Sequence, residues 1–275
     1  MTATLPRVVA LLATCNSGDR LTATLRSLQA QTYPNLRILI SDDASTDTTP
    51  VQLLAASLAD PRIRVIRQPR RRGWVGNINA LLAKAEGDCF FFMPHDDELA
   101  PTYVEKLVAA LNSHPAAVLA FSDLDCYENG TFREVQLYRE VEGEADRVRR
   151  AIRWLDQPTS GWCIPYRGLF RAEAARSFGG LWKHLAGEFG ADWVWLFHMA
   201  LLGAWVRVPE VLYRRNRGQH SLSESWTHGT WRWFSVVMAC GREVLRANVL
   251  SREKARLLCA VAHTGRRVVR GGFIW

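Results

Sequence analysis

Short apolar runs alternate with stretches of helical periodicity along the first 100 residues. The runs have the length of buried strands, and they lie at residues 7–13, 36–40, 63–66 and 90–93. Between them, apolar side chains recur at three- or four-residue spacing, as at Leu21, Leu25 and Leu28, and this spacing predicts helices. The alternation of strand and helix predicts an α/β fold with a mainly parallel sheet and helices on both faces.

The pattern is less regular after residue 100. We expect a helix up to Ser113, a strand at 117–121, either a hairpin or a mobile loop at 128–144, and a strand at 161–170. An apolar helix at 192–202, a short strand at 205–208 and a basic polar loop at 213–223 follow. Two final helices are expected at 230–247 and 251–267. We therefore expect a main domain over residues 1–225 and a C-terminal helical extension over 226–275.

Adjacent acids follow the most apolar of the predicted strands. Pro94 ends this strand, and His95, Asp96 and Asp97 come next. Ligands of open α/β sheets bind outside the carboxyl ends of the strands. Two neighbouring carboxylates repel each other unless a cation lies between them or a pKa shifts. Such hard oxygen ligands suit Mg²⁺ or Mn²⁺, which commonly hold a substrate's phosphates, whereas the alternative is a solvated acidic turn before the next helix.

Composition narrows the class of partner and the compartment. The chain of 275 residues has no apolar run long enough for a transmembrane helix and no evident signal peptide. Its six scattered cysteines lack a C-x-x-C pair, which favours free thiols in a reduced cytoplasm. The net charge of +8 favours phosphorylated substrates, anionic lipid or nucleic acid, but no nucleic-acid-binding motif is present. We therefore expect no nucleic acid partner.

The basic C-terminal end supports two interpretations. It runs through several arginines to Phe273, Ile274 and Trp275. Such an end can rest on an anionic membrane, which would make the protein peripheral at the cytoplasmic face. The alternative is a helix that packs on the main domain and leaves a solvated basic face.

Four stretches occur in a characteristic order. They are ATCNSGDRL at 13–21, SDDASTD at 41–47, HDDEL at 95–99 and ADWVWLFHMALLGAW at 191–205. Together they resemble the family 2 glycosyltransferases of the Rossmann-like GT-A fold, over roughly residues 7–223. The resemblance implies an inverting transfer from a nucleotide sugar, with a nucleotide-sugar-binding half at 1–100 and an acceptor-binding half at 101–225.

The resemblance also implies roles for residues on the donor side. Asp97 is expected to bind the metal, and Asp96 to contact the ribose or share the metal through water; Pro94 stands where many relatives have an acid. Asp43 is expected to accept a hydrogen bond from the nucleotide base, while its alternative role is a turn or helix cap. Further donor contacts are expected from Ala13, Thr14, Asn16 and Asn79.

On the acceptor side, Asp192 is the expected general base, which takes the proton of the attacking hydroxyl. Ala191 stands where the family often has Glu, and Glu188 is the reserve candidate for the base. His220 is expected as a further metal ligand or diphosphate contact. Four tryptophans are candidates for sugar contact or for the core, namely Trp162, Trp182, Trp193 and Trp195.

These inferences predict a glycosyltransferase that uses Mg²⁺ or Mn²⁺ and a nucleotide sugar, for which a UDP-sugar is expected. The expected acceptor is a glycan or lipid-linked glycan of surface polysaccharide synthesis. Two alternatives stay open. One is a catalytically degenerate GT-A scaffold that binds nucleotide or glycan, and the other is a metal-dependent phosphohydrolase that uses His95 and Asp96.

Overall fold

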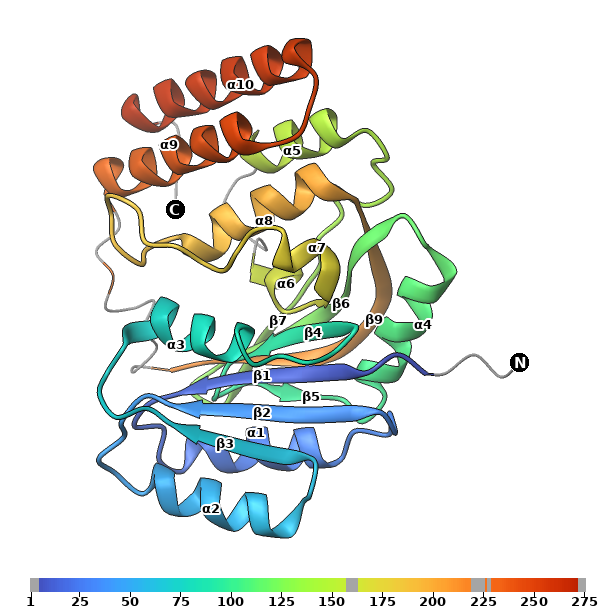
Figure 1. Ribbon diagram of the computed structural model, residues 1–275, viewed down its shortest axis with the longest axis vertical. Coiled ribbons are helices and arrows are strands. Elements are labelled where there is room, and N and C mark those ends of the chain that lie inside the picture. The colour runs from blue at the N-terminus through green and yellow to red at the C-terminus, as the bar shows by residue number, and fades with distance from the viewer. Residues whose placement is uncertain (1–4, 157–162, 219–225, 227–228, 272–275) are drawn as a thin grey trace.

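The described strands form one curled sheet with helices packed around it (Figure 1). The computed structural model describes residues 5–156, 163–218, 226 and 229–271. Strand order is β3-β2-β1-β4-β8-β6-β9-β5, and β7 pairs with β6. The predicted α/β fold is confirmed.

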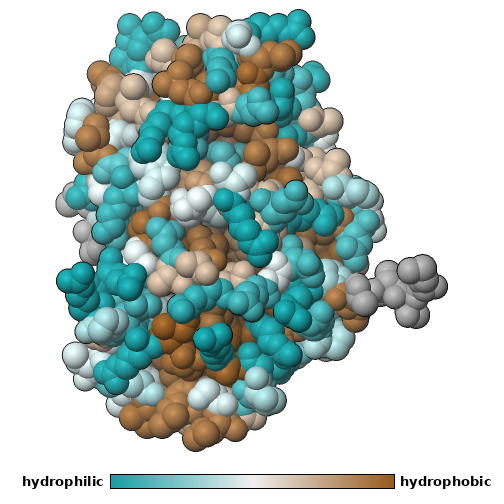
Figure 2. Space-filling view, in the orientation of Figure 1, coloured by the Kyte–Doolittle hydropathy of each residue, from teal (hydrophilic) through white to brown (hydrophobic). Residues whose placement is uncertain are grey.

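The first half of the chain supplies the parallel part of the sheet. Its strands are β1 (Val8–Thr14), β2 (Leu36–Asp42), β3 (Ile63–Arg67) and β4 (Cys89–Met93), and they are joined by the helices α1 (Arg20–Gln29), α2 (Thr49–Ala59) and α3 (Gly73–Leu82). β1 lies between β2 and β4 in parallel register. The four strands and three helices predicted here are therefore confirmed. In α2, Leu53 is buried, whereas Leu54 and Leu58 are 59% and 80% exposed, and Figure 2 shows an apolar patch at that lower end of the molecule.

The second half of the sheet is mixed. Its elements are β5 (Glu98–Leu99), α4 (Tyr103–Ser113), β6 (Ala117–Glu128), β7 (Thr131–Gln136), α5 (Arg147–Asp156), α6 (Cys163–Tyr166), β8 (Leu169–Arg171), α7 (Ala172–Arg176), α8 (Ala191–Leu202) and β9 (Ala204–Arg217). β8 runs antiparallel to both β4 and β6, whereas β9 is parallel to β6. The hairpin predicted near residue 128 is confirmed as β6–β7.

Two predicted elements of this half were wrong. The strand expected at 161–170 is instead a short helix, α6, followed by the three-residue β8. Gly168 lies between α6 and β8. It allows the chain to approach β6 closely, since a Cβ there would lie 2.5 Å from the Ala120 carbonyl oxygen. The basic loop expected from residue 213 is strand up to Arg217, because β9 pairs with β6 along nearly its whole length.

The C-terminal helices pack on the main domain. α9 (Thr230–Arg246) lies on α8, and α10 (Ser251–Val269) lies on α5 and α9 (Figure 1). His198 of α8 and Glu243 of α9 meet at 3.1 Å (Nδ1 to Oε2) in a buried contact. One continuous apolar core runs from Val8 to Val268, so the helices share the core of the sheet. Phe273, Ile274 and Trp275 lie outside the described residues.

Gly190 permits the close contact between α8 and α9, and this can be tested. Its φ is +65°, and a Cβ there would lie 2.7 Å from Val236 Cγ2 on α9. We expect Gly190→Ala to lower the free energy of unfolding in urea, from left-handed strain of roughly 1–2 kcal/mol plus roughly 1–3 kcal/mol of overpacking.

Gly187→Ala is the matched control. Gly187 has φ +72° and no atom within 4 Å of the added Cβ, so it should show the strain alone. Equal losses in the two variants would contradict the proposed α8–α9 contact.

Candidate active site

A cavity of about 250 Å³ lies at the carboxyl ends of β1 and β4. β1 contributes Ala13, and β4 leads into Pro94, His95 and Asp96. The opposite wall carries Asp192 from the first turn of α8. The remaining walls are largely aromatic or basic and include Trp74, Phe92, Tyr166, Arg167, Phe189, Arg215, Trp226 and Trp233. This is the edge of the sheet at which ligands of α/β folds bind.

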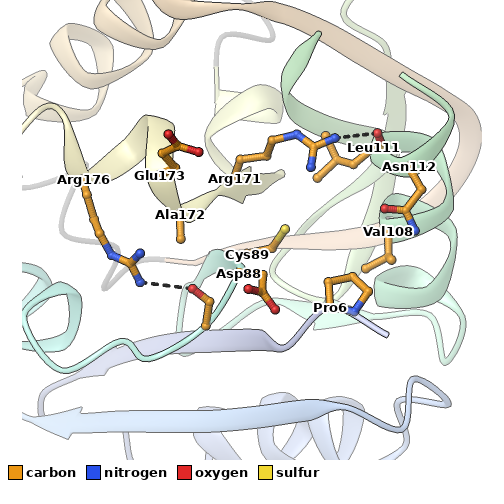
Figure 3. A pocket seen from close by; sticks show the side chains of 11 residues that line it. Pro6, Asp88, Cys89, Val108, Leu111, Asn112, Arg171, Ala172, Glu173 and Arg176 are labelled. Carbon is orange, nitrogen blue, oxygen red and sulfur yellow. Dashed lines mark hydrogen bonds between the residues drawn. The ribbon is translucent and has the colours of Figure 1, made fainter. Parts of the chain in front are cut away.

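A second cavity, of about 270 Å³, lies near the amino ends of β1 and β4 (Figure 3). The side chains of its two arginines already donate hydrogen bonds to backbone carbonyl oxygens. Arg171 donates to the oxygens of Leu111 and Ala117, and Arg176 donates to that of Gly87. This cavity also contains two carboxylates, Asp88 and Glu173, and Asp88 Oδ2 accepts the Arg7 N–H at 2.7 Å (Figure 3).

Asp96 is the acid that faces the cavity. Burial, and then the neighbouring Asp97 carboxylate, raise the pKa of Asp96 to about 6. Its backbone oxygen accepts a hydrogen bond from Asn216 Nδ2 at 2.8 Å, which fixes the loop. The backbone N–H of Asp96 itself donates to the carboxylate and opposes the rise in pKa, and no other described residue donates a hydrogen bond to this carboxylate. A half-buried carboxylate in this position gains from a cation.

The Asp97 carboxylate does not line the cavity and instead accepts hydrogen bonds from three other residues. Its Oδ2 accepts from Arg167 Nε at 2.9 Å and from Tyr213 Oη at 2.8 Å. Its Oδ1 accepts from the backbone N–H of Asn216 at 2.9 Å, and the side chain is fully buried. The predicted metal role of Asp97 therefore competes with three hydrogen bonds, whereas that of Asp96 does not.

Asp192 lies in the cavity wall opposite the acid loop. It is 8% exposed, and burial raises its pKa to about 7. The Trp193 N–H donates to its Oδ1 at 3.0 Å and partly counteracts this rise. A carboxylate with a pKa near neutrality is suited to accept a proton at physiological pH. Glu188 is less suited, because it receives the N–H of Trp74 and lies 2.9 Å from Lys183 Nζ.

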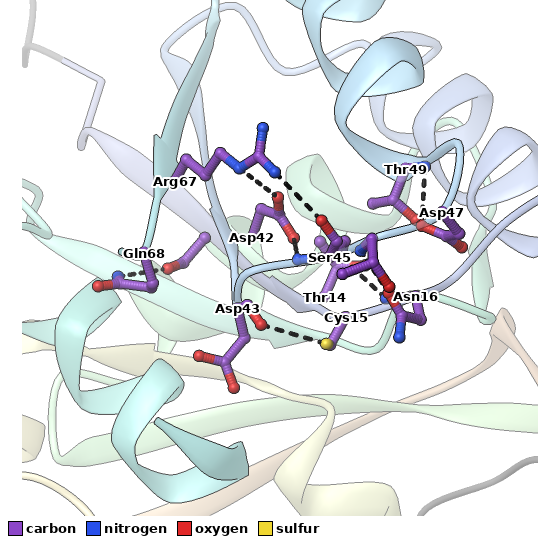
Figure 4. A network of polar contacts seen from close by, with 12 residues as sticks. Thr14, Cys15, Asn16, Asp42, Asp43, Ser45, Asp47, Thr49, Arg67 and Gln68 are labelled. Atoms are coloured by element: carbon purple, nitrogen blue, oxygen red, sulfur yellow. Dashed lines mark hydrogen bonds and ion pairs between the residues drawn. The ribbon is translucent and has the colours of Figure 1, made fainter. Parts of the chain in front are cut away.

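Polar residues after β1 and β2 form a connected network (Figure 4). Asn16 Oδ1 accepts the Thr46 N–H at 2.9 Å, and the Thr14 hydroxyl contacts that of Ser17. Both Asp43 carboxylate oxygens accept backbone N–H groups, from Arg72 at 2.7 Å and Gly73 at 3.0 Å. Asp43 therefore caps α3 as the alternative interpretation predicts, and its remaining lone pairs are what a nucleotide base would use.

The other predicted contact residues either do not line this cavity or lie outside the described residues. Asn79 pairs with the backbone of Leu181 through both side-chain atoms, at 2.6 and 2.9 Å, and so fixes α3 to the loop before α8. Trp193 and Trp195 are buried in the core. His220 and Trp162 lie outside the described residues, and Trp182 is half-buried away from the cavity lining.

The sequence interpretation missed most of the aromatic wall. Trp74, Trp226 and Trp233 come from three separate segments, and no local pattern links them. It also missed Arg167, although a single arginine within the apolar stretch at 161–170 is a usual sign of a buried ion pair.

Comparison with known families decides the class of protein. The model of glycosyl transferase family 2 matches residues 10–177. The chain belongs to glycosyl transferase family 2. It is therefore a transferase, and the cavity described above lies partly within the matched region.

Two curated relatives of this glycosyltransferase act in glycan synthesis by name. The succinoglycan biosynthesis protein ExoO of Rhizobium meliloti (strain 1021) is 29% identical over 137 residues, or 50% of this chain. The UDP-Glc:alpha-D-GlcNAc-diphosphoundecaprenol beta-1,3-glucosyltransferase WfaP of Escherichia coli is 33% identical over 98 residues, or 36% of this chain. The matched regions span 38% of the length of each of these relatives.

A solved structure shares the fold of the glycosyltransferase. Staphylococcus aureus TarS (residues 1–349), in complex with UDP-GlcNAc, superposes with a TM-score of 0.73 at 17% identity. The match covers 94% of this chain and 72% of that one. The likeness establishes the GT-A fold.

The described residues lack two features. They contain no cluster of three or more His, Cys, Asp or Glu side chains suited to a metal. None of the described helices is long and apolar enough to cross a bilayer.

Burial, and then the charge of Arg20, lower the pKa of His95 to about 4. The match to glycosyl transferase family 2 disfavours the phosphohydrolase alternative.

The raised pKa of Asp192 predicts a change in stability with pH. Because the folded state holds this proton up to about pH 7 and the unfolded chain releases it near the ordinary aspartate pKa of 3.8, stability is lost as pH rises between these values. Asp192→Asn removes the cost of the buried charge. It should stabilise the protein by roughly 2–4 kcal/mol at pH 8 but have little effect at pH 4.

Urea unfolding without nucleotide or metal measures this difference. Asp60→Asn is a control of opposite sign, because its hydrogen bonds from Arg62 lower the pKa of Asp60 and the charged form contributes stability. A stability gain from Asp192→Asn that is the same at both pH values would contradict the assigned pKa.

Proposed function

We propose that this glycosyltransferase moves a sugar from a nucleotide-sugar donor, a UDP-sugar, to a glycan or lipid-linked acceptor with inversion at the anomeric carbon. The observation that carries the proposal is the presence of two carboxylates with raised pKa in one cavity, Asp96 and Asp192. The two groups suit different tasks. Asp96 can bind the metal that neutralises charge on the donor, and Asp192 can take the proton of the acceptor hydroxyl.

On the donor side, we assign the metal to Asp96 in place of Asp97. One or two carboxylates, with substrate phosphates and water, are the usual protein contribution to a Mg²⁺ site. Asp96 fits such a site because its carboxylate faces the cavity and accepts no hydrogen bond from another described residue. Bound Mg²⁺ or Mn²⁺ would supply Lewis-acid stabilisation of the departing diphosphate. Arg215 lines the same cavity, forms no ion pair within the described residues, and would add positive charge there.

The nucleotide would lie across the ends of β1 and β2. Ala13 lines the cavity, and the network of Thr14, Asn16 and Asp43 adjoins it. His220 is kept as a further candidate metal ligand from the sequence. The UDP-GlcNAc complex of the fold relative TarS supports the choice of a UDP-sugar.

On the acceptor side, Asp192 would take the proton as the acceptor hydroxyl attacks the anomeric carbon. The bond to the diphosphate breaks as the new glycosidic bond forms, so one displacement inverts the configuration. A glycan or lipid-linked acceptor is supported by the names of the relatives ExoO and WfaP. The scaffold alternative differs in one respect, since it predicts donor binding without turnover.

Asparagine variants of the two adjacent acids separate metal binding from folding. Mutating a residue that only hydrogen-bonds to a metal ligand already lowers metal affinity by roughly 10- to 100-fold. Asp96→Asn should therefore weaken UDP binding by at least as much in Mn²⁺ and little in EDTA. It should keep or raise the urea midpoint at pH 8, because it removes a buried charge whose pKa is raised. Asp97→Asn should instead destabilise the protein by roughly 3–5 kcal/mol, because Arg167 would be left as a buried unpaired charge.

Calorimetry with UDP and urea unfolding measure both effects. Loss of Mn²⁺-dependent UDP binding in Asp97→Asn with an unchanged fold, alongside an unaffected Asp96→Asn, would return the metal to Asp97.

We further propose that α9 and α10 contact an anionic membrane that carries the acceptor. The outer face of α10 exposes Arg252, Arg256, Arg266 and Arg270, none of which forms an ion pair with another described residue. Beside it, α9 exposes Trp231 by 62% and Leu245 by 62%. Figure 2 shows apolar and hydrophilic residues side by side over these helices.

Vesicle sedimentation tests this contact. The protein should sediment with vesicles of phosphatidylcholine and phosphatidylglycerol but weakly with phosphatidylcholine alone. Since each interfacial arginine contributes about 1 kcal/mol, Arg252→Glu with Arg256→Glu should reduce anionic binding by more than about tenfold.

The control pair, Arg37→Glu with Arg64→Glu, makes the same change of charge on exposed residues of β2 and β3. Equal losses from both pairs would indicate a nonspecific effect of net charge and would contradict the α9–α10 surface.

A further inference from the structure

The outer face of α2 is apolar although it is exposed. Val51, Leu54 and Leu58 are 71%, 59% and 80% exposed. Their spacing of three and then four residues places them on one face of the helix, and Figure 2 shows the apolar patch at this end of the molecule. The helix itself carries no charged residue. A contiguous exposed apolar patch marks an interaction surface, whereas single exposed apolar residues are normal.

α1 and α2 form one layer, in which they run in the same direction. They lie side by side below the first strands of the sheet in Figure 1. Where they begin, the Gly18 N–H donates to Asp47 Oδ2 at 3.0 Å. Where they end, Arg62 Nη2 donates to the Gln29 oxygen at 2.7 Å. The beginnings of the two helices are therefore together at one end of the layer, and their last turns are together at the other.

The exposed charges of this layer are separated along its length. Asp19 and Asp47 are exposed where the helices begin, and Arg26 is exposed in the last turn of α1. Arg20 also lies at the acidic end, where its guanidinium donates to backbone oxygens of the loop after β1. Two acids and one arginine leave that end with a net negative charge. An uncharged apolar centre thus lies between an acidic end and a basic end.

A second copy of this chain has the surface that complements this layer. If two copies pair about a two-fold axis perpendicular to α2, each α2 lies antiparallel to the other. The acidic end of each copy then faces the basic end of the other copy. Leu54 meets its own counterpart near the axis, and Val51 meets Leu58 of the other copy. One surface therefore supplies both the apolar contact and the opposite charges.

Two other exposed elements fit a second copy less well. α9 exposes Trp231 and Leu245, but it also exposes Arg242, so two copies of that face would bring charges of the same sign together. β3 is the last strand of the sheet, but two of its five residues are arginines. Charged side chains on an edge strand disfavour pairing with another strand.

We propose that α2 is the centre of a two-fold homodimer interface of this glycosyltransferase. The apolar faces of α2 from two copies form the contact, and Asp19 and Arg26 of α1 form ion pairs across its rim. α2 and α10 lie at opposite ends of the molecule, so the pairing leaves the surface of α9 and α10 open (Figure 1). A contact of two helix layers is small, so the association is reversible and increases with protein concentration.

Sedimentation velocity over a concentration series measures the association. The parent protein should change from monomer to dimer and form nothing larger, because a two-fold contact closes on itself. Leu54→Glu should weaken the dimer more than about tenfold, since it places two carboxylates face to face in an apolar contact. Leu245→Glu is the matched control, because this leucine of α9 is 62% exposed, against 59% for Leu54. It should leave the dimer unchanged, and both variants should keep the urea midpoint of the monomer.

Exchange of the rim charges tests the orientation of the two copies. Asp19→Arg and Arg26→Asp should each weaken the dimer about two- to tenfold, the effect of exposed ion pairs, and the double variant should restore it. Asp19 makes no side-chain capping hydrogen bond, so its replacement removes no such bond from α1.

Several results would overturn the proposal. A parent protein that stays monomeric at about 100 μM, where a micromolar dimer would be mostly formed, would assign the α2 face to another protein. A dimer that survives Leu54→Glu, or one that Leu245→Glu dissociates, would place the interface elsewhere. Assemblies larger than a dimer would contradict the two-fold contact. A double charge variant that associates no more tightly than the single variants would contradict the antiparallel arrangement.

Discussion

The buried carboxylate of Asp97 is the constraint on which the site depends. It joins Arg167, Tyr213 and Asn216, which lie 70, 116 and 119 residues away along the chain. Each partner has a neighbour that lines the cavity: Asp96 beside Asp97, Tyr166 beside Arg167, and Arg215 between Tyr213 and Asn216. The contacts of the Asp97 carboxylate therefore fix the backbone beside three residues of the cavity lining, Asp96, Tyr166 and Arg215. Buried ion pairs often add little net stability, but breaking one is costly, so the main contribution of Asp97 here is to fix geometry.

The cavity concentrates groups that are unfavourable in the folded protein. Asp192 and Asp96 are kept from full ionisation by burial. Their cost is offset by dense packing behind them, where Phe90, Phe92, Phe170 and Trp195 form a connected aromatic cluster. Functional sites commonly retain such local destabilisation because ligand or metal satisfies the groups only when bound. The arrangement is thus what a binding site with separate charge and proton tasks requires.

The sequence predicted the first half of the fold well because strand and helix alternate there with clear periodicity. It also located the acids after β4, since their position depends on one local strand. It did not determine which acid faces the cavity, because that choice is made by Arg167, Tyr213 and Asn216 from distant segments. Asn79 and Asp43 show the same limit. The resemblance implies donor contacts for both, yet Asn79 pairs with Leu181 and Asp43 caps α3, and neither contact follows from local sequence.

The C-terminal helices are coupled to the site more closely than a separate extension would be. Trp226 and Trp233 lie beyond the boundary predicted at residue 225, yet both line the cavity. Val236 packs against Gly190, two residues before Asp192, and Glu243 holds His198 on the same helix as Asp192. A force on the outer face of α9 and α10 would therefore reach α8 through packed side chains. If a membrane binds that face, the same contact that brings the enzyme to its acceptor would also support the wall that carries the candidate base.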